Sequence, residues 1–334
     1  MLKQTIKVLV SGVGGDVAQG IIKCLELSNL DIEIYKICVS SKSSWLYKDN
    51  KSYIVPFSSD DNYITTLLKI IKKHSIDIFI PTVDNEIPII SNNKSYLESE
   101  SKVKVFVDDI EKIEYCDDKY LTYQFLKQHS FSTPLTIVPV NKKEVNDFLS
   151  KTTYPILSKP RRGRGAVNII TIRTKEEAYL WIRNETVILQ EYLDGEEYTT
   201  GIYLGDDLEV KGICTLKREL KGGTTFKAER VIDKALELEL EIIAKKLKIK
   251  YLNIQSRLVN NKLVPFEFNG RFSGTTGIIS RVFNAPEMYI KEKFLNQNIE
   301  RVNSEVIFHV MRYYEEIYSD TQQTEDLINR SNEL

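Results

Sequence analysis

Short apolar runs rich in β-branched residues alternate with amphipathic stretches through the first third of the chain. The apolar runs are residues 7–10, 34–39, 78–81 and 103–107, and the stretches with helical spacing of apolar positions are residues 17–27 and 63–73. Alternation of this kind predicts a parallel sheet with helices on both faces. We therefore expect a Rossmann-like α/β domain over residues 1–115.

The pattern changes after residue 115, where a helix over residues 120–129 leads into shorter elements. Residues 134–190 read as strand, helix, strand, glycine-rich loop, strand, helix and strand. Such a short run of mixed elements predicts a compact subdomain. Together with the linker helix, we expect residues 116–190 to form a small lid.

Longer strands that read as antiparallel hairpins follow from residue 191. The hairpins are residues 198–204 with 208–215 and residues 253–259 with 262–268, and a helix over residues 233–247 separates them. Turn-forming residues between the strands support both hairpins. We expect a C-terminal catalytic lobe over residues 191–315, followed by a polar tail over residues 316–334 that forms a frayed helix or stays mobile.

The balance of charge argues against one large class of function. The 334 residues include 46 basic and 47 acidic residues, a formal net charge of -1, and no long run of one sign. A nucleic-acid-binding protein usually shows a basic excess or stripe. Four scattered cysteines and three histidines argue in the same way against a structural zinc site and a disulfide scaffold.

The N-terminal residues run straight into the first strand and lack the apolar core of a signal peptide. No apolar stretch reaches the roughly 18 residues expected of a membrane-spanning helix. The chain is 42% hydrophobic, which is enough for proper cores. We therefore expect a folded, cytoplasmic protein that does not contact a membrane.

An apolar strand in the last quarter of the chain ends in polar side chains. Side chains alternate along a strand, so Glu267, Asn269 and Arg271 should share one face. Phe266 and Phe268 should then point into the core. Two oxygen ligands beside a fixed cation suit Mg²⁺ bound together with nucleotide phosphates. The alternative is an ordinary polar strand end at a turn.

A second strand ends in Lys159 and is followed by the glycine-rich segment 161–166. A lysine that points toward such a loop can contact phosphates while the backbone N–H groups of the loop cover them. The segment is not a Walker A loop, because the Gly-Lys-Ser/Thr ending is absent. The alternatives are a solvated basic turn, or a loop in which Arg161, Arg162 and Arg164 grip an anionic substrate.

A third segment, residues 187–199, runs from an apolar strand into an exposed acidic stretch. The backbone of such a strand can offer donors and acceptors to an adenine edge, and a nearby carboxylate can accept both ribose hydroxyls. Glu197 is the candidate for the ribose. Acidic residues at a turn are also commonplace, so the segment alone does not single out ATP.

The glycine-rich turn from Gly12 to Gly15 lies where a doubly wound fold could bind a phosphate. A dinucleotide fingerprint also needs an acidic residue at the end of the second strand, and that strand ends in Val39, Ser40 and Ser41. We favour a tight turn that packs helix on strand without a cofactor. A dinucleotide-binding oxidoreductase is the alternative.

The order of these motifs resembles the ATP-grasp superfamily, and within it the carbamoyl-phosphate-synthase-like and carboxylate-amine ligase branch. The motifs are Lys119 at a helix start, Lys159 with Pro160 before the glycine loop, segment 190–199, Gln255, and segment 267–271. The resemblance covers nearly the whole chain, from Gly12 to residue 295. It implies an α/β ATP-grasp fold with a Rossmann-like pre-ATP-grasp domain, a lid and a C-terminal antiparallel lobe.

The resemblance also implies a nucleotide site. The matched residues are, for the phosphates, Lys119, Lys159 and the loop from Gly163 to Gly165; for adenine, Gln190 with the backbone at Glu191 and Leu193; and for the ribose, Glu197. The implied cofactors are ATP and Mg²⁺, with Mn²⁺ as an alternative metal.

The metal ligands of this branch lie on adjacent antiparallel strands, and the resemblance maps them onto Gln255, Glu267 and Asn269. Gln255 stands where many ligases carry aspartate, although it matches the carbamoyl-phosphate-synthase type. A neutral ligand predicts weak Mg²⁺ affinity without nucleotide. The catalytic cations that the resemblance implies are Arg271, which stabilises the transferring phosphoryl group, Lys159 and Arg218.

The implied reaction is ATP-dependent amide or peptide bond formation through an acyl phosphate. The partners would be a small polar carboxylate, such as an amino acid or a modified sugar acid, and an amine, in an enzyme that is often a homodimer. Glycine-bearing segments 220–225 and 272–277 would face these substrates, although Thr275 and Thr276 could simply cap a helix. The alternative within the family is a carbamoyl-phosphate-type or carboxylate kinase acting with a partner protein.

Overall fold

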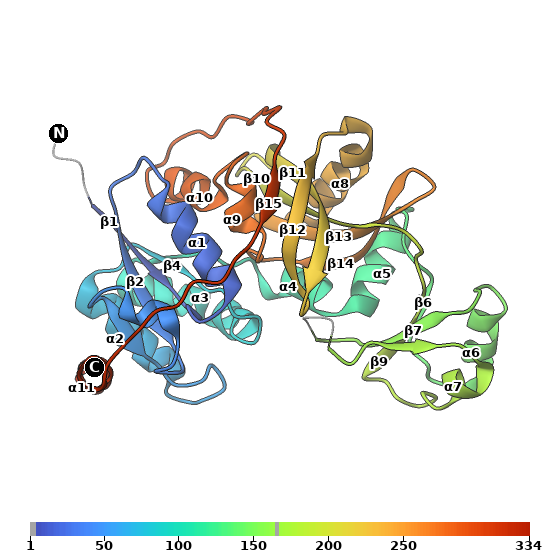
Figure 1. The fold of residues 1–334 in the computed structure, drawn as a ribbon, viewed down its shortest axis with the longest axis horizontal. Coiled ribbons are helices and arrows are strands. Elements are labelled where there is room, and N and C mark those ends of the chain that lie inside the picture. The colour runs from blue at the N-terminus through green and yellow to red at the C-terminus, as the bar shows by residue number, and fades with distance from the viewer. Residues whose placement is uncertain (1–4, 164–166) are drawn as a thin grey trace.

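The computed structural model describes residues 5–163 and 167–334. The described N-terminal part contains a five-stranded parallel sheet in the order β3-β2-β1-β4-β5, flanked by helices (Figure 1). Its elements are β1 (Ile6–Val10), α1 (Asp16–Glu26), β2 (Ile32–Cys38), the 3-10 helix η1 (Ser44–Tyr47), β3 (Ser52–Ile54), α2 (Tyr63–His74), β4 (Ile78–Ile80), α3 (Ile87–Ser101) and β5 (Lys104–Val105). The central strand β1 sets the register, because Val8 lies opposite both Ile34 and Ile78. The predicted doubly wound α/β sheet is confirmed.

Two linker helices lead into a small four-stranded antiparallel sheet in the order β6-β9-β7-β8. The elements are α4 (Ile110–Asp117), α5 (Lys119–Gln128), β6 (Thr136–Ile137), α6 (Lys142–Leu149), β7 (Ile156–Pro160), β8 (Ile170–Ile172), α7 (Lys175–Tyr179) and β9 (Val187–Glu191). Helices α6 and α7 lie against this sheet at one end of the molecule (Figure 1). Val145, Phe148 and Ala178 from these helices are buried together with Ile156, Ile172 and Leu189.

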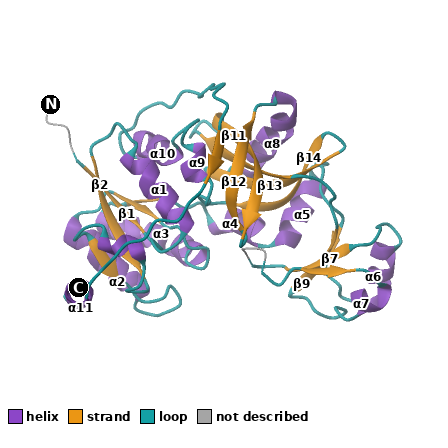
Figure 2. Ribbon diagram, in the orientation of Figure 1, coloured by secondary structure: helices purple, strands orange, loops and turns teal. Residues whose placement is uncertain are grey.

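The C-terminal part is built on a larger antiparallel sheet with the order β14-β13-β10-β11-β12-β15 among the described residues (Figure 2). Its elements are β10 (Glu197–Leu204), β11 (Val210–Lys221), β12 (Thr224–Val231), α8 (Lys234–Leu247), β13 (Tyr251–Val259), β14 (Lys262–Asn269), α9 (Thr276–Ile279), α10 (Ala285–Lys293), β15 (His309–Met311) and α11 (Thr321–Asn332). The hairpin β13-β14 turns at Asn260 and Asn261, which have φ values of 49° and 59°. The expected ATP-grasp architecture of one parallel and two antiparallel sheets is present.

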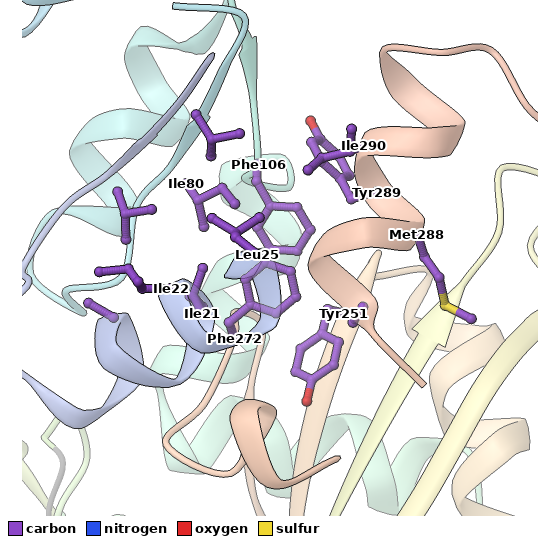
Figure 3. Packing of buried hydrophobic residues seen from close by; sticks show 14 of the residues in the cluster. Ile21, Ile22, Leu25, Ile80, Phe106, Tyr251, Phe272, Met288, Tyr289 and Ile290 are labelled. Atoms are coloured by element: carbon purple, nitrogen blue, oxygen red, sulfur yellow. The ribbon is translucent and has the colours of Figure 1, made fainter. Parts of the chain in front are cut away.

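One continuous hydrophobic core joins the N-terminal sheet to the C-terminal lobe (Figure 3). Phe106 stacks on Phe272 with ring centroids 4.0 Å apart, and Tyr289 meets Phe106 edge-on at 4.7 Å. Helix α1 approaches α9 so closely that a Cβ on Gly277 would lie 2.8 Å from Gly20 Cα. Glycine at both positions permits this backbone contact, which holds α9 against α1.

The C-terminal segment differs from the predicted frayed helix or mobile tail. It crosses from the lobe to the N-terminal sheet and ends in α11 (Figure 1). A capping box between Asp320 and Gln323 starts this helix, and Leu327 is buried. The Ile54 N–H donates to Ser331 Oγ at 2.8 Å, so α11 is fastened to edge strand β3. Polar composition hid the docking, because one apolar residue and a cap are enough to seat the helix.

Leu327→Ala should lower the free energy of unfolding by about 2–4 kcal/mol, because it truncates a fully buried side chain and leaves a cavity. The measurement is urea unfolding followed by circular dichroism. The adjacent Ile328 is 39% exposed, so Ile328→Ala should cost less than about 0.5 kcal/mol and serves as the control. Equal unfolding midpoints for the two variants would show that α11 does not dock in solution.

None of the helices in the described ranges is long and apolar enough to cross a membrane.

Candidate active site

A cleft of about 300 Å³ lies between the small antiparallel sheet and the larger one. Strands β7 and β9 supply one wall, and β10, β13 and β14 supply the other. The residues of the cleft that the sequence singles out for the nucleotide and its metal are Lys119, Lys159, Gly163, Gln190, Glu191, Leu193, Glu197, Arg218, Gln255 and Glu267. Gly165 and Arg164 lie outside the described residues. The fold therefore gathers distant motifs around one space.

Lys159 is a buried cation at the centre of the cleft. It lies on β7, and its Nζ donates to Gln190 Oε1 at 2.8 Å and lies 4.9 Å from the centroid of the Phe266 ring. Loss of water around the ammonium lowers its pKa to about 8, and the negative charge of Glu267 opposes that shift. A desolvated cation in a cleft is strongly attracted to an incoming anion, such as a phosphate chain.

Lys119 lies at the start of α5 and contacts the described start of the glycine-rich loop. Its Nζ donates to the Gly163 carbonyl at 2.6 Å. Asp118 caps α5 by accepting from the Tyr120 N–H, and it also binds Arg161 Nη2 at 2.6 Å. Burial alone would raise the pKa of Asp118, but the Arg161 guanidinium brings it below its ordinary value. The contacts of Lys119 and Arg161 dock the described start of the glycine loop on the linker helix.

Two of the three arginines that the sequence offered for an anion grip already have carboxylate partners in this conformation, and Arg164 lies outside the described residues. Arg161 is paired with Asp118, and Arg162 Nη1 lies 2.7 Å from Asp117 Oδ2. Both acids lie where α4 ends and α5 begins. Spacing along the chain does not reveal that they pair with the arginines of the loop. Each of these two guanidinium groups is already paired with a carboxylate. In this conformation the two arginines therefore fix the position of the loop.

The adenine prediction is only partly compatible with the geometry. The Gln190 carboxamide is committed on both sides, since it accepts from Lys159 and its Nε2 donates to Thr136 Oγ1 at 3.0 Å. The Glu191 N–H donates to the Leu135 carbonyl at 2.9 Å, so it is not a free donor for a base. The last two hydrogen bonds join β9 to the edge strand β6 of the small sheet and to the residue before it. Leu193 lines the cleft beyond that edge.

Glu197 lies between two arginines at the mouth of the cleft. Its Oε1 accepts from Arg218 Nη2 at 2.5 Å, and its Oε2 accepts from Arg257 Nη2 at 2.9 Å. A ribose would have to share these carboxylate oxygens with the guanidinium groups. Sequence reasoning missed Arg257, although it stands two positions after Gln255 on the same strand and therefore on the same face.

The predicted metal ligands meet on adjacent strands. Gln255 lies opposite Glu267 in the β13-β14 register. Together with Asn269 they line a second cavity, of about 370 Å³, which shares Gln255 and Glu267 with the cleft. Carboxylate and carboxamide oxygens are donors that fit Mg²⁺. In the described ranges no three His, Cys, Asp or Glu residues converge as a metal site.

Phe266 corrects the simple alternation that the sequence predicted for this strand. The register shifts between Gln255 and Ser256, which pair with Glu267 and Pro265, and Phe266 is the extra residue of this bulge. A bulge turns the local side chain away from its expected face. Phe268 is buried as predicted, but Phe266 lines the cleft beside Lys159.

Arg271 crosses from the lobe to the N-terminal domain. Its Nη2 lies 2.7 Å from Asp84 Oδ2, its Nε also bonds Asp84, and its Nη1 donates to the Phe272 carbonyl at 2.7 Å. Asp84 follows β4 at the carboxyl edge of the parallel sheet, where ligands of such folds bind. Sequence reasoning missed Asp84, although its position after β4 could have marked it as a site residue. The pair holds the guanidinium in the wall of the second cavity.

The far side of the second cavity is closed by the segment before α9. Arg312, from the C-terminal crossing, lies 3.3 Å from Asp16 Oδ2 and donates to the Gly274 carbonyl. The Thr276 hydroxyl accepts from the Ser273 N–H at 2.9 Å, and Ser273 lies before the helix. The N-cap residue Thr275 makes no side-chain capping hydrogen bond, so the geometry does not support the capping interpretation. Segment 220–225 is the turn between β11 and β12, with φ values of 59° and 79° at Gly222 and Gly223.

The turn from Gly12 to Gly15 packs tightly against the segment after β4. Gly15 N–H donates to the Gly12 carbonyl at 2.9 Å, so the turn satisfies its own backbone. Gly12 has a φ of 61°, and a Cβ there would lie 2.3 Å from Val83 Cγ2. The geometry favours the tight packing turn over the oxidoreductase interpretation.

Two family models match the chain, in the regions that carry these sheets. A model of the ATP-grasp domain matches residues 116–226, and a model of the PylC-like N-terminal domain matches residues 8–106. The chain belongs to the ATP-grasp superfamily. Its N-terminal sheet and helices form a PylC-like N-terminal domain.

Curated relatives and solved structures agree with this assignment. D-alanine–D-alanine ligase from Bacillus anthracis is 24% identical over 133 residues, which are 38% of this chain and 44% of the ligase. The match thus spans less than half the length of that relative.

Solved structures share the fold at low sequence identity. N5-carboxyaminoimidazole synthetase from Staphylococcus aureus, solved with ADP, is 14% identical with a TM-score of 0.67, over 87% of this chain and 78% of the other. L-amino acid ligase from Bacillus licheniformis is 14% identical with a TM-score of 0.64, over 86% of this chain and 73% of the other.

Proposed function

We propose that the protein is an ATP- and Mg²⁺-dependent carboxylate-amine ligase that joins an amino acid, or a similar small acid, to an amine. A carboxylate oxygen attacks the γ-phosphorus of ATP, which gives an acyl phosphate and releases ADP. The amine then attacks the acyl carbon, so that phosphate leaves, the amine loses a proton and an amide remains. Such chemistry needs positioning and charge neutralisation more than a nucleophilic side chain.

The observation that carries this proposal is the shared wall of the two cavities. Arg218, Gln255 and Glu267 line both the cleft and the second cavity. A nucleotide in the cleft would therefore present its terminal phosphate to whatever occupies the second cavity. There, two cations and several oxygen donors would face the reacting groups, which is the arrangement that phosphoryl transfer requires.

The residue roles follow from this placement. Lys119, Lys159 and the Gly163 loop would hold the phosphates, and Gln255, Glu267 and Asn269 would hold Mg²⁺ with them. Arg271 and Arg218 would stabilise charge on the transferring group. The two relatives whose names describe amino acid ligases support an amino acid as the acid. A homodimer stays a prediction, which sedimentation equilibrium would test.

The test is ADP release from purified protein with Mg²⁺, ATP and hydroxylamine, across amino acids, dicarboxylates and uronic acids. Hydroxylamine intercepts an acyl phosphate as a hydroxamate, so the natural amine need not be known. A hydroxamate with one class of acid, formed together with ADP, is the expected result. Tight ATP binding with no ADP from any acid would contradict the proposal.

A further inference from the structure

A third cavity, of about 680 Å³, lies at the carboxyl ends of the strands of the N-terminal sheet. Apolar side chains make up much of its walls, and Ser58, Ser59 and Asn85 also line it. The apolar lining residues are Val39, Val55, Phe57, Val83, Pro88 and Ile89. Phe57 is 63% exposed, and Val39 and Val83 are 40% and 41% exposed. Three exposed apolar side chains that converge on one hollow indicate a binding surface for an apolar group.

The floor of this cavity offers no spare charge. Glu86 is buried there, and its oxygens accept from Ser11 Oγ, from Tyr63 OH at 2.8 Å and from the Thr82 N–H at 2.8 Å. Burial raises the pKa of Glu86, and these hydrogen bonds oppose the rise. A carboxylate that is already surrounded by donors inside the protein has little capacity left for a ligand. The interior of the cavity therefore suits an uncharged, apolar group.

Charged residues of the cavity lie where it adjoins the active site. Asp84 lines both this cavity and the second one, beside Arg271. Gly163 lines both this cavity and the nucleotide cleft. Arg162 and Asp117, which also line this cavity, neutralise each other at 2.7 Å. A molecule with its polar head at Asp84 and Arg271 could thus extend an apolar body into the cavity.

We propose that this cavity selects the side chain of the acid that the enzyme activates, and that the acid is an α-amino acid with an apolar side chain. Its carboxylate would replace the Asp84 carboxylate on Arg271, and the Asp84 oxygens released in this way would accept from its ammonium. Val39, Phe57 and Val83 are then the residues that set specificity. The inference rests on the proposed ligase function and adds the substrate class to it.

The test compares amino acids that share one head group. Hydroxamate formation is measured with both enantiomers of alanine, leucine, phenylalanine, aspartate and lysine at saturating Mg²⁺-ATP. We expect kcat/KM for leucine or phenylalanine to exceed that for alanine, aspartate and lysine by roughly tenfold or more, as a side-chain pocket of this kind provides. Highest kcat/KM with aspartate, lysine or alanine would overturn the inference.

Phe57→Ala tests the wall directly. The variant should raise KM for the preferred apolar amino acid roughly tenfold while KM for ATP stays unchanged. Leu180→Ala is the matched control, because Leu180 is 82% exposed and does not line any of these three cavities among the described residues. Equal KM values for the amino acid in both variants would remove Phe57 from the site.

Calorimetry separates this inference from the proposed function. L- and D-leucine, phenylalanine and aspartate are titrated into the protein with a nonhydrolysable ATP analogue, and into Phe57→Ala. Binding of leucine or phenylalanine that weakens in Phe57→Ala supports the cavity even where no acid yields ADP, a result that would overturn the ligase alone. No binding of either apolar amino acid, with or without ADP formation from other acids, overturns the cavity inference.

Discussion

Replacing Glu267 by glutamine should lower ADP formation by roughly 10²- to 10³-fold or more, the cost of losing one preorganised electrostatic group at a reacting phosphate. Glu267 lies opposite Gln255, which is already neutral, so the variant leaves two carboxamides where the reaction needs negative charge for Mg²⁺. The side chain keeps its size, so the walls of both cavities stay in place. The measurement is ADP release under the hydroxylamine conditions described above.

A matched variant separates loss of this charge from a general effect on the sheet. Glu196 is next to Glu197 on the same sheet, its side chain is 57% exposed, and it pairs with Lys217 away from the cleft. Glu196→Gln should therefore retain ADP formation within about twofold, because exposed ion pairs contribute little. Full activity in Glu267→Gln would remove this residue from the site, and equal losses in both variants would point to folding.

Periodicity predicted the elements well wherever one face of a strand or helix is buried. Residues 142–149 form α6 as expected, and the hairpin turn at Asn260 and Asn261 falls where the two asparagines indicated it. Helix α3 was missed, because its sequence is largely polar and only Ile87, Ile90 and Leu97 are buried. Local pattern is a strong signal only when enough apolar residues repeat with the period of the element.

The candidate site was predicted where its residues belong to single segments, and was incomplete where they meet across the fold. The strand that carries Glu267 and Asn269 was found from its own alternation, but the bulge that turns Phe266 into the cleft depends on the partner strand. The contact of Arg271 with Asp84 joins residues 187 positions apart. No spacing rule links two such residues, because the sheet edges that bring them together are set by tertiary packing.

The ion pairs around the lid show the same limit. The sequence offered Arg161 and Arg162 as part of one alternative, a grip for an anionic substrate, and each has an acidic partner where the two linker helices meet. Their partners, Asp118 and Asp117, were visible in the sequence only as an acidic pair before a helix. A basic residue near a glycine loop therefore becomes a ligand candidate only after its acidic neighbours in space are known.

The second large effect concerns Lys159 and pH. The pKa of Lys159 is lowered to about 8, while an unfolded lysine has its ordinary value near 10.5. The buried ammonium therefore costs stability below about pH 8, and its contribution to stability improves as the pH rises from 8 toward 10.5. Bound phosphates favour the charged form. Affinity for ATP should thus be greatest below pH 8 and fall by up to about tenfold per pH unit above it.

Calorimetric titration with ATP from pH 7 to about 9.5 measures this dependence, and binding near pH 8.5 should take up a proton from the buffer.

Lys159→Met keeps the apolar stem and removes the charge. The variant should weaken ATP binding roughly 10- to 100-fold, because hydrogen bonds to charged groups contribute about 1.5–3 kcal/mol. Its affinity for ATP should not change with pH over that range. Lys119→Met is the control, since it removes the other lysine of the cleft and should weaken binding while the dependence on pH survives. Constant affinity of the unmodified protein between pH 7 and about 9.5 would contradict either the lowered pKa or the contact of Lys159 with the phosphates, and the affinity of Lys159→Met tells the two apart.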